Sequence, residues 1–454
     1  MNFLSVVTPE LLLVCTVLAP GIVFLVVAAA WLVGWKPAEK TFARITNGTF
    51  AFSALMFAAL LLRMFQGGLT SLSAGKGNWY EVHTFRIPLT LFVDRLSVPL
   101  VALTVVLCGM VGVFARRYLH RDPGFYRFFL LLHLFAFAAL LVFTAASFDL
   151  LIGGWELICV TSVLLIAFFQ QRPAPAKNSI RVFATYRACD VGLILGAFLL
   201  HHATGSTLYE SVFSGSWPTQ GSAVQGGLAT AIGCLLLFAA MGKSAQVPFS
   251  GWMPRAMEGP TPSSAIFYGA ISVHVGAYLL LRSQPILAAS PVASAVVVAV
   301  GVCSALHGTL VARACTDAKT SLAYSSVSQL GLIVAEIGFG FSWLALAHIA
   351  GHAIVRTLQF LKAPSALHEF HGMHAAAGGH LAPTGSHYER LLPAKAQSWL
   401  YRLAFDRGHL DTVIDRFFAG ALTRFAVRMT SLEVRWAHTR TMAGVLRSER
   451  RFND

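Results

Sequence analysis

Charged residues are scarce in this chain of 454 residues, where Asp, Glu, Lys and Arg together make up only 12%. A soluble globular domain averages about 25% charged residues. Half that fraction leaves too few polar groups to cover a water-facing surface, while 56% of the residues are hydrophobic. The composition therefore excludes an ordinary soluble protein and predicts an integral membrane protein, with lipid as the solvent for much of its surface.

Closely spaced cysteines are also lacking. The seven cysteines lie in or beside apolar runs, and no two of them are separated by two residues. This pattern is typical of small buried hydrophobic residues. The sequence therefore predicts neither a disulfide framework nor a metal site in this chain.

Negative charge is the rarer sign, because 20 Asp and Glu stand against 34 Lys and Arg, for a net charge of +14. An excess of this size in a soluble domain would suggest a nucleic-acid partner, but the sequence contains no RNA- or DNA-binding motif. Most Lys and Arg lie between apolar runs or in residues 364–454. We interpret the excess as topological charge plus a basic segment that contacts membrane lipids, with no nucleic-acid partner.

Long apolar runs are what the chain has in abundance. They occupy residues 8–34, 46–66, 93–115, 125–147, 149–170, 181–203, 226–250, 262–282, 288–312, 319–340 and 342–363. Each is close to the ~20 residues that a membrane-spanning helix needs. No basic segment precedes the first run, and it is long enough to span, so we expect a membrane helix there rather than a cleaved signal peptide. The pattern predicts an all-α polytopic membrane protein with about eleven transmembrane helices.

Lys and Arg alternate between the two sides of this predicted bundle. The loops after the first, third, fifth, seventh and ninth runs carry them, whereas the other loops are poor in them apart from residues 67–92. Basic loops favour the cytoplasmic side of a membrane. We therefore expect a periplasmic N-terminus and a cytoplasmic C-terminus in a bacterial inner membrane.

Residues 364–454 differ from the rest of the chain. They open with a His- and Gly-rich stretch at 368–387, for which we weigh a metal site against a cytoplasmic linker and prefer the linker. A basic amphipathic segment follows, which we expect to lie as helices on the membrane or against a partner. A twelfth span at 412–432 is disfavoured by its charges. We divide the chain into residues 1–92 (two helices and a surface loop), 93–363 (an ion-conducting core) and the tail.

Ionisable residues inside the predicted spans need a partner or a function, because charge is costly in hydrocarbon. The candidates are Glu156, Arg187, Asp190, Lys243, His274, Lys319, His348, His352 and Arg356. Lys243 is followed within eleven residues by Pro248, Gly251 and Pro254, so we expect a broken seventh helix. The last three candidates recur every four residues and therefore share one face of a helix.

Several of these charges also have a static explanation. Arg187 and Asp190 can neutralise each other, and a lone histidine such as His274 is often a satisfied core residue. Lys319 can simply mark the end of its helix. Glu156 and Lys243, together with the stripe that ends at Arg356, exceed what packing requires, so we expect them to relay H⁺ or Na⁺. Moving the carboxylate toward or away from the amine would switch the amine between holding and releasing a proton.

Four motifs carry a resemblance to a known family: GWEL at 154–157, GKSAQ at 242–246, MEGPTP at 257–262 and LAYSSVSQLG at 322–331. They resemble the antiporter-like subunits of respiratory complex I and of Mrp antiporters over about residues 90–370. The resemblance implies the complex I antiporter-like fold, with a glutamate on the fifth helix, a lysine on the broken seventh and a Lys/His line beyond. The residues on those positions are Glu156, Lys243, Lys319, His348 and His352, with Arg356 where complex I has a lysine.

The chain departs from that pattern at Tyr268, where the family places a histidine. Residues 251–257, 263–270, 274–278 and 358–365 look like the DabB-type membrane subunits of two-component DAB inorganic-carbon accumulation systems. That resemblance implies a DabA-like partner, a zinc protein similar to β-carbonic anhydrases. The ion gradient would then drive CO₂ hydration to bicarbonate in the partner. The zinc would belong to the partner, so this chain would be a transporter subunit without a cofactor and without enzyme activity.

Two other hypotheses stay open. One is a proton-pumping subunit of a complex I-like NADH–quinone oxidoreductase or of a Mrp-type cation/proton antiporter. The other is a membrane anchor that binds a soluble partner through its basic tail and conducts nothing. The buried acid and amine favour conduction over the anchor.

Overall fold

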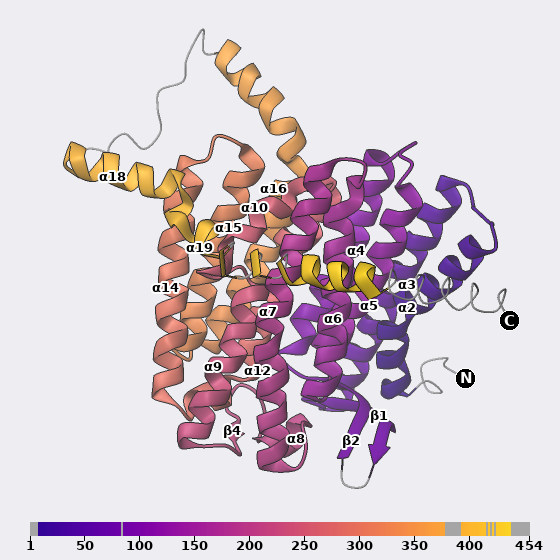
Figure 1. Ribbon diagram of the computed structural model, residues 1–454. Coiled ribbons are helices and arrows are strands. Elements are labelled where there is room, and N and C mark those ends of the chain that lie inside the picture. Colours follow the sequence, from indigo (N-terminus) through magenta and orange to yellow (C-terminus); the bar gives the residue numbers. More distant parts are fainter. Residues whose placement is uncertain are drawn as a thin grey trace, which may run out of the picture.

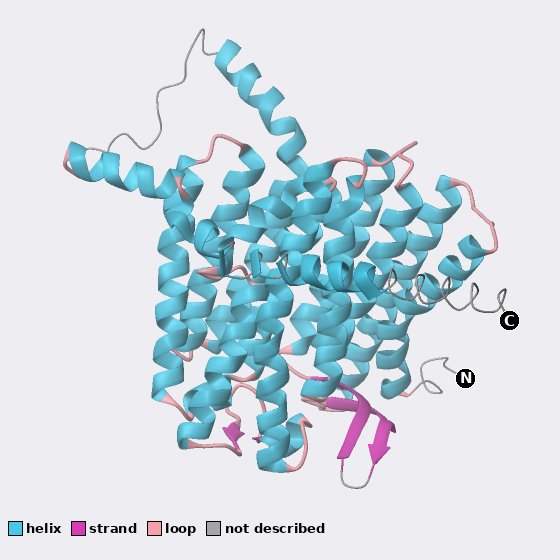
Figure 2. Cartoon of the chain, viewed as in Figure 1, coloured by secondary structure: helices cyan, strands magenta, loops and turns pink. Residues whose placement is uncertain are grey.

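The computed structural model describes residues 8–82, 85–376, 392–414, 416–417, 420–421 and 424–436. Most of it is helical, with strands only at one end of the molecule (Figure 1, Figure 2). The long helices are α2 (Pro9–Leu32), α3 (Glu39–Gln66), α4 (Ser97–Tyr118), α5 (Phe125–Phe143), α6 (Phe148–Ile166), α7 (Pro173–Thr204), α9 (Gly226–Lys243), α14 (Pro291–Ala314), α15 (Ala318–Gly338) and α16 (Ser342–Ala376).

Shorter elements complete the bundle and the tail. They are η1 (Ala167–Phe169), α8 (Tyr209–Val212), η2 (Phe249–Gly251), α10 (Trp252–Arg255), η3 (Ala256–Glu258), α11 (Thr261–Ser264), η4 (Ala265–Ala270), α12 (His274–Arg282), α13 (Gln284–Ala288), α18 (Ala394–Phe405), η5 (Arg407–His409) and α19 (Leu410–Ile414). Residues 424–436 are also helical.

Ten helical segments in the described part of the chain are long and apolar enough to cross a membrane. They coincide with ten of the predicted runs, so the all-α membrane fold is confirmed. The remaining run, 319–340, forms α15, which packs between α14 and α16 but carries more polar side chains. Because that helix is part of the same bundle, the eleven predicted runs correspond to ten apolar segments and one more polar helix.

Local sequence signals place the helices that carry the candidate residues. Ser147 caps α6 by accepting a hydrogen bond from the backbone N–H of Leu150 at 3.1 Å, which puts Glu156 in the middle of that helix. Asp317 caps α15 in the same way through the N–H of Thr320 at 2.8 Å. Gly205, with φ of +75°, ends α7 in the left-handed conformation that glycine favours.

Residues 67–92, expected as a surface loop, contain a hairpin at one end of the bundle (Figure 2). Strands β1 (Leu72–Val82) and β2 (Phe85–Val93) pair antiparallel, and β2 leads directly into α4. A second, two-residue pair joins β3 (Phe213–Ser214) to β4 (Gly221–Ser222). These strands between the long helical runs were not predicted from the sequence.

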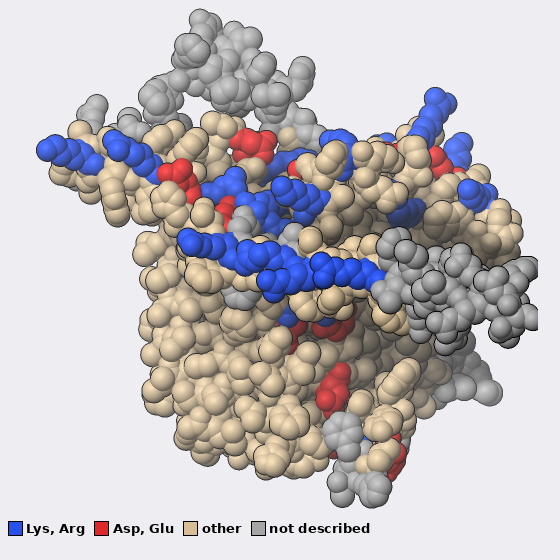
Figure 3. Space-filling model, in the orientation of Figure 1, with Lys and Arg blue, Asp and Glu red and all other residues tan. Residues whose placement is uncertain are grey.

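Lys and Arg side chains gather at the end of the bundle that also carries α18, while the opposite end shows few of them (Figure 3). The start of α2 and the β1–β2 hairpin lie toward that opposite end (Figure 1). This asymmetry is the one that the alternating basic loops predict. Which end faces the cytoplasm stays a prediction.

The tail returns to the bundle at α19. Asp411 accepts a hydrogen bond from Arg255 Nη1 at 2.9 Å, and its backbone oxygen accepts one from Arg181 at 3.3 Å. Ile414 packs with Phe249 in a small buried cluster. The helix at 424–436 is exposed along its length and runs across the bundle (Figure 1), and no spanning helix is found in the described parts of the tail.

Two predictions for the tail meet the limits of the described residues. Helix α16 continues through the predicted boundary at 363 and ends at Ala376. The His-rich stretch at 368–387 lies outside the described residues from 377 onward, and its earlier side chains are not described either. Its role as a linker stays a prediction.

Candidate ion-translocation site

The seventh spanning helix is broken at Lys243, as the sequence predicts. Helix α9 ends at this residue, and the chain continues through the short helices η2 and α10. Backbone groups released by the break find other partners: Trp252 Nε1 donates to the Gly242 carbonyl at 2.8 Å, and the Val247 N–H donates to Ser304 Oγ at 3.0 Å. At these two positions the backbone polar groups at the break are thus satisfied by side chains.

The Lys243 side chain is 1% exposed and points among residues of α6 and α7. Its Nζ lies 2.7 Å from Cys159 Sγ and 3.3 Å from the Trp155 carbonyl oxygen. The same nitrogen lies 4.7 Å from the ring centre of Tyr186 and 5.1 Å from that of Trp155. Aromatic faces stabilise an ammonium ion in surroundings that exclude water, so this site can hold the charged amine without a direct carboxylate partner.

A cluster of acidic and basic groups continues from the amine toward Glu156. Asp190 is buried and accepts hydrogen bonds from Trp155 Nε1 at 2.5 Å and from Arg187 Nη2 at 2.6 Å. Arg187 also forms an ion pair with Glu156 through Nη1. The Cys159 thiol lies 3.7 Å from Asp190, and it thereby joins this cluster to Lys243.

Glu156 and Lys243 are thus connected, but not directly. A continuous polar line runs from Lys243 through Cys159 and Asp190 to Arg187 and Glu156. Among the described residues, no ion pair joins Lys243 to a carboxylate. The sequence predicts the mutual neutralisation of Arg187 and Asp190, and the structure adds Glu156 as a second partner of the same guanidinium.

Three of the groups in this cluster were not singled out from the sequence: Trp155, Cys159 and Tyr186. Cys159 was interpreted only as a small buried hydrophobic residue, whereas its thiol lies between an amine and a carboxylate. Its position three residues after Glu156, on one face of α6, was the available signal. Tyr186 left no such signal, because its contact with Lys243 depends on how α7 is rotated against α9.

Ligand atoms of Glu156, Cys159 and Asp190 lie within 4.8 Å of one another, close enough to surround a metal ion. Arg187 already bonds both carboxylates and supplies the positive charge between them. A metal ion would have to displace this guanidinium, so the group does not fit a zinc site and we assign no metal to it.

The eighth spanning segment is also interrupted, which the sequence did not reveal. A π-helical turn, η4, is followed by three residues outside any regular helix before α12 begins at His274. π-Turns inside membrane helices commonly mark functional sites. Tyr268, on this turn, is buried and its hydroxyl has no hydrogen-bond partner within the described structure.

His274 and His352 form a buried pair at this second break. His274 Nε2 lies 2.8 Å from His352 Nδ1, and His274 Nδ1 lies 2.8 Å from the Ala270 carbonyl oxygen. A carbonyl only accepts, so the His274 proton is assigned to Nδ1, and its Nε2 accepts from His352 Nδ1–H. His352 Nε2 is then a buried acceptor that lacks a hydrogen-bond partner within the described part of the chain.

The two outer residues of the predicted stripe on α16, His348 and Arg356, contact α15, whereas His352 contacts α12. His348 lies between Gln329 Oε1 and Glu336 Oε1, at 2.9 Å from each. Arg356 donates to Ser325 Oγ at 2.7 Å. The partners on α15 were missed, although Glu336 is an acidic residue inside a predicted span and was visible as such.

Lys319 stands apart from both clusters. It is half-buried in the first turn of α15, and it makes no hydrogen bond or ion pair within the described ranges. The structure therefore brings together Glu156, Arg187, Asp190 and Lys243 in one cluster and His274, His348, His352 and Arg356 along another. Lys319 belongs to neither.

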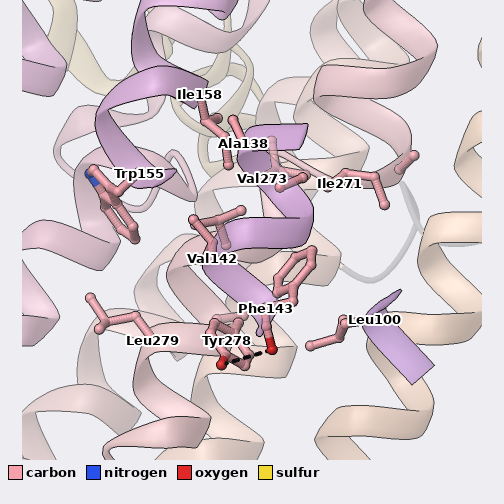
Figure 4. Close-up of a cluster of buried hydrophobic side chains, with 14 of the residues drawn as sticks. Leu100, Ala138, Val142, Phe143, Trp155, Ile158, Ile271, Val273, Tyr278 and Leu279 are labelled. Carbon is pink, nitrogen blue, oxygen red and sulfur yellow. Dashed lines mark hydrogen bonds between the residues drawn. The ribbon is translucent and has the colours of Figure 1, made fainter. Parts of the chain in front are cut away.

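Apolar side chains surround these polar groups. Ala138, Val142, Ile158, Ile271 and Val273 are all buried and gather between α5, α6 and the break before α12 (Figure 4). Bulk water is excluded from such a core, so an ion passing through it depends on the fixed polar groups.

The family of the chain is decided by sequence comparison. Residues 145–382 match the family model described as NADH:quinone oxidoreductase/Mrp antiporter, TM, which covers more than half of the chain. The chain belongs to this family. Residues 79–129 match a second model, described as NADH-ubiquinone oxidoreductase (complex I), chain 5 N-terminus. The resemblance stated from the motifs is confirmed at the level of the family.

Individual relatives agree with this assignment. NADH-quinone oxidoreductase subunit L of Mycobacterium tuberculosis is 36% identical over 295 residues, covering 64% of this chain and 46% of that protein. NADH-ubiquinone oxidoreductase chain 5 of Schizophyllum commune is 35% identical over 294 residues, covering 65% of this chain and 42% of that protein. The chain spans less than half the length of these curated relatives.

A solved structure also matches. A chain in the structure of the Mrp complex from Dietzia sp. DQ12-45-1b superposes with a TM-score of 0.64 and 28% sequence identity, covering 77% of this chain and 37% of that chain. The antiporter-like membrane fold that the resemblance implies is thereby confirmed.

Proposed function

We propose that this chain carries H⁺ or Na⁺ across the membrane as the ion-translocating subunit of a multi-subunit complex related to complex I or Mrp antiporters. The observation that carries the proposal is the polar line that runs from the buried Lys243 through the buried Cys159 and Asp190 to the partly exposed Arg187 and Glu156. A static core has no need for such a line, because each buried charge is costly. Family membership supports the same function.

Arg187 is the switching element of the line. It bonds both Glu156 and Asp190, so one guanidinium serves two carboxylates. When it turns fully toward Glu156, Asp190 is left to attract a cation or a proton by way of Lys243. When Arg187 turns back toward Asp190, the cation or proton held at Asp190 is released. A membrane potential supplies about 2.3 kcal/mol per charge per 100 mV, which is comparable to the cost of exchanging such pairs.

The second cluster continues the route by proton relay. A proton that binds His352 Nε2 allows the proton on Nδ1 to pass to His274 Nε2, so the ring moves one proton from one side to the other. His348, held between Glu336 and Gln329, extends the line along α16. Ions carried as H⁺ can use this path directly.

Replacing Glu156 with glutamine tests the proposal. In vesicles that contain the purified complex and an internal pH dye, we expect the flux to fall by about 10-fold or more, because Arg187 then keeps to Asp190 and the switch is lost. The matched control is Glu210→Gln, which removes an exposed carboxylate on α8. An E156Q protein that transports as well as E210Q, with its partners still bound, would favour the anchor hypothesis.

A second candidate function is the one implied by the DAB resemblance, in which the gradient drives CO₂ hydration in a DabA-like zinc protein. It is favoured by the motifs at 251–257 and 263–270 and by the His274–His352 pair, which stands in place of a histidine at Tyr268. The relatives described above are complex I and Mrp proteins, so the first candidate has the broader support. The carbon-transport candidate rests on motif resemblance alone.

Purification with native partners separates the two candidates. A complex I-type assembly should co-purify with flavin and iron–sulfur proteins, whereas a DAB-type assembly should co-purify with a zinc protein. The DAB-type assembly should also restore growth in ordinary air to a carbonic-anhydrase-deficient host. Metal analysis and absorbance spectra of the purified complex give the answer. Zinc without flavin or iron would reverse the order of the two candidates.

A further inference from the structure

Helix α12 stands between the two polar clusters. The carbonyl oxygen of Val273, just before the helix, accepts a hydrogen bond at 2.6 Å from the hydroxyl of Ser244, the residue after Lys243. The next residue, His274, contacts His352 on the other side. The start of α12 therefore touches both the broken seventh helix and the histidine pair.

Close backbone approach makes this contact tight. A Cβ atom added at Gly276 would lie 2.4 Å from Ser244 Oγ and 2.8 Å from the Ala240 carbonyl oxygen. No side chain fits at this position, so α12 lies directly against the last turn of α9. A shift of α12 along or around its axis must therefore change the surroundings of Lys243.

Nothing in the local helix holds α12 in place, because it has only nine residues and follows the break after η4. Helices this short are marginal on their own and depend on tertiary contacts. His274, Tyr278 and Arg282 recur every four residues and share one face of α12. The far end of that face carries the strongest contact of the helix.

That contact is a buried ion pair between Arg282 and Asp94. Arg282 is 0% exposed and donates to both oxygens of Asp94, at 2.6 and 3.0 Å. Asp94 also accepts from the N–H of Ser97 at 3.0 Å, at the start of α4. Tyr278 lies 3.3 Å from Arg282 Nη2 and donates its hydroxyl proton to the Phe143 carbonyl at 3.4 Å (Figure 4).

We propose that Asp94 and Arg282 are positioning residues of the ion path, which fix the height and rotation of α12 and thereby hold His274 against His352 and Ser244 against Val273. A bidentate carboxylate–guanidinium pair restrains both translation and rotation, which a single hydrogen bond does not. The inference rests on the proposed function, because the clusters it aligns are the ones assigned to ion transfer.

The experiment compares Asp94→Asn and Arg282→Lys with Glu81→Gln, which breaks an exposed ion pair with Arg86 on the adjoining hairpin. Flux is measured in vesicles per amount of folded complex. We expect D94N to lower the flux about 10- to 100-fold, since a misplacement of about 1 Å in a reacting group can cost ~100-fold. R282K, which keeps the charge but loses the fork, should retain more flux than D94N, and E81Q should match the unmodified protein.

A double-mutant cycle tells positioning from general stability. If Asp94 acts through His274, the D94N/H274Q protein should transport no more slowly than H274Q alone. Hydrogen exchange measured by mass spectrometry on the same complexes should be faster in D94N over residues 271–283 and unchanged over α2. Fold-losses that multiply in the double variant, or flux in D94N equal to that in E81Q, would overturn the inference.

Two further outcomes are separable. If the unmodified complex transports no ion but D94N still speeds exchange over residues 271–283 alone, the proposed function fails while the anchoring of α12 stands. If neither D94N nor R282K accumulates in the membrane, the pair supports folding at large and the positioning role is overturned.

Discussion

Replacing Lys243 with alanine is expected to lower ion flux by about 10²- to 10⁴-fold, the range typical of removing a positioned proton-transfer group. Lys243 is 1% exposed, and at the break in the seventh helix its amine contacts the Cys159 thiol and the Trp155 carbonyl oxygen. Without it, the polar line ends at Cys159, and no amine remains at the break. Flux is measured with an internal pH dye and, separately, with ²²Na⁺.

Controls for this variant come from the same chain. Lys40→Ala removes an exposed amine near the start of α3 and should leave the flux unchanged. Lys243→Arg keeps the charge but replaces a compact ammonium with a planar guanidinium, which does not fit between the thiol and the Tyr186 ring, so it should be nearly as impaired as alanine. Flux in K243A above half of that in K40A would exclude Lys243 from the ion path.

The sequence predicts the broken helix well, because its causes are local. Pro248, Gly251 and Pro254 follow Lys243 closely, and each disfavours a continuous helix whatever surrounds it. The stripe of His348, His352 and Arg356 is local in the same sense, since spacing alone puts it on one face of α16.

Partners across helices could not be predicted in this way. Arg187 lies three residues before Asp190, so that contact follows from spacing, whereas its pair with Glu156 depends on how α6 and α7 are rotated against each other. The same holds for Tyr186 over Lys243 and for Gln329 and Glu336 beside the histidines. Relative rotation is fixed by side-chain packing between helices, which a single sequence does not display.

The eighth spanning segment and its Arg282–Asp94 ion pair show a second limit of prediction from sequence. The apolar run 262–282 predicts one continuous span, yet it divides into α11, η4 and α12. Arg282, the last residue of this run, is completely buried against Asp94. An arginine at the end of an apolar run is ordinarily a marker of the membrane surface, and only the distant Asp94 reverses that expectation.

Replacing His352 is expected to have the second large effect, a loss of H⁺ flux of about 100-fold or more, as for other positioned proton-transfer groups. The two substitutions to compare are alanine and glutamine. Glutamine keeps a hydrogen-bond donor toward His274 Nε2, but an amide cannot bind a proton on one side and release it from the other near neutral pH. If His352 relays protons, H352Q should therefore be as impaired as H352A.

The two substitutions separate relay from structure. If His352 only supports α12 through its 2.8 Å contact with His274, glutamine should restore most of the flux that alanine removes. His202→Gln, at an exposed position near the end of α7, is the matched control and should transport normally. Among the described residues, Nε2 of His352 has no hydrogen-bond partner, and this is the reason to expect the relay result. A buried acceptor without a hydrogen bond is costly unless it has a proton to receive.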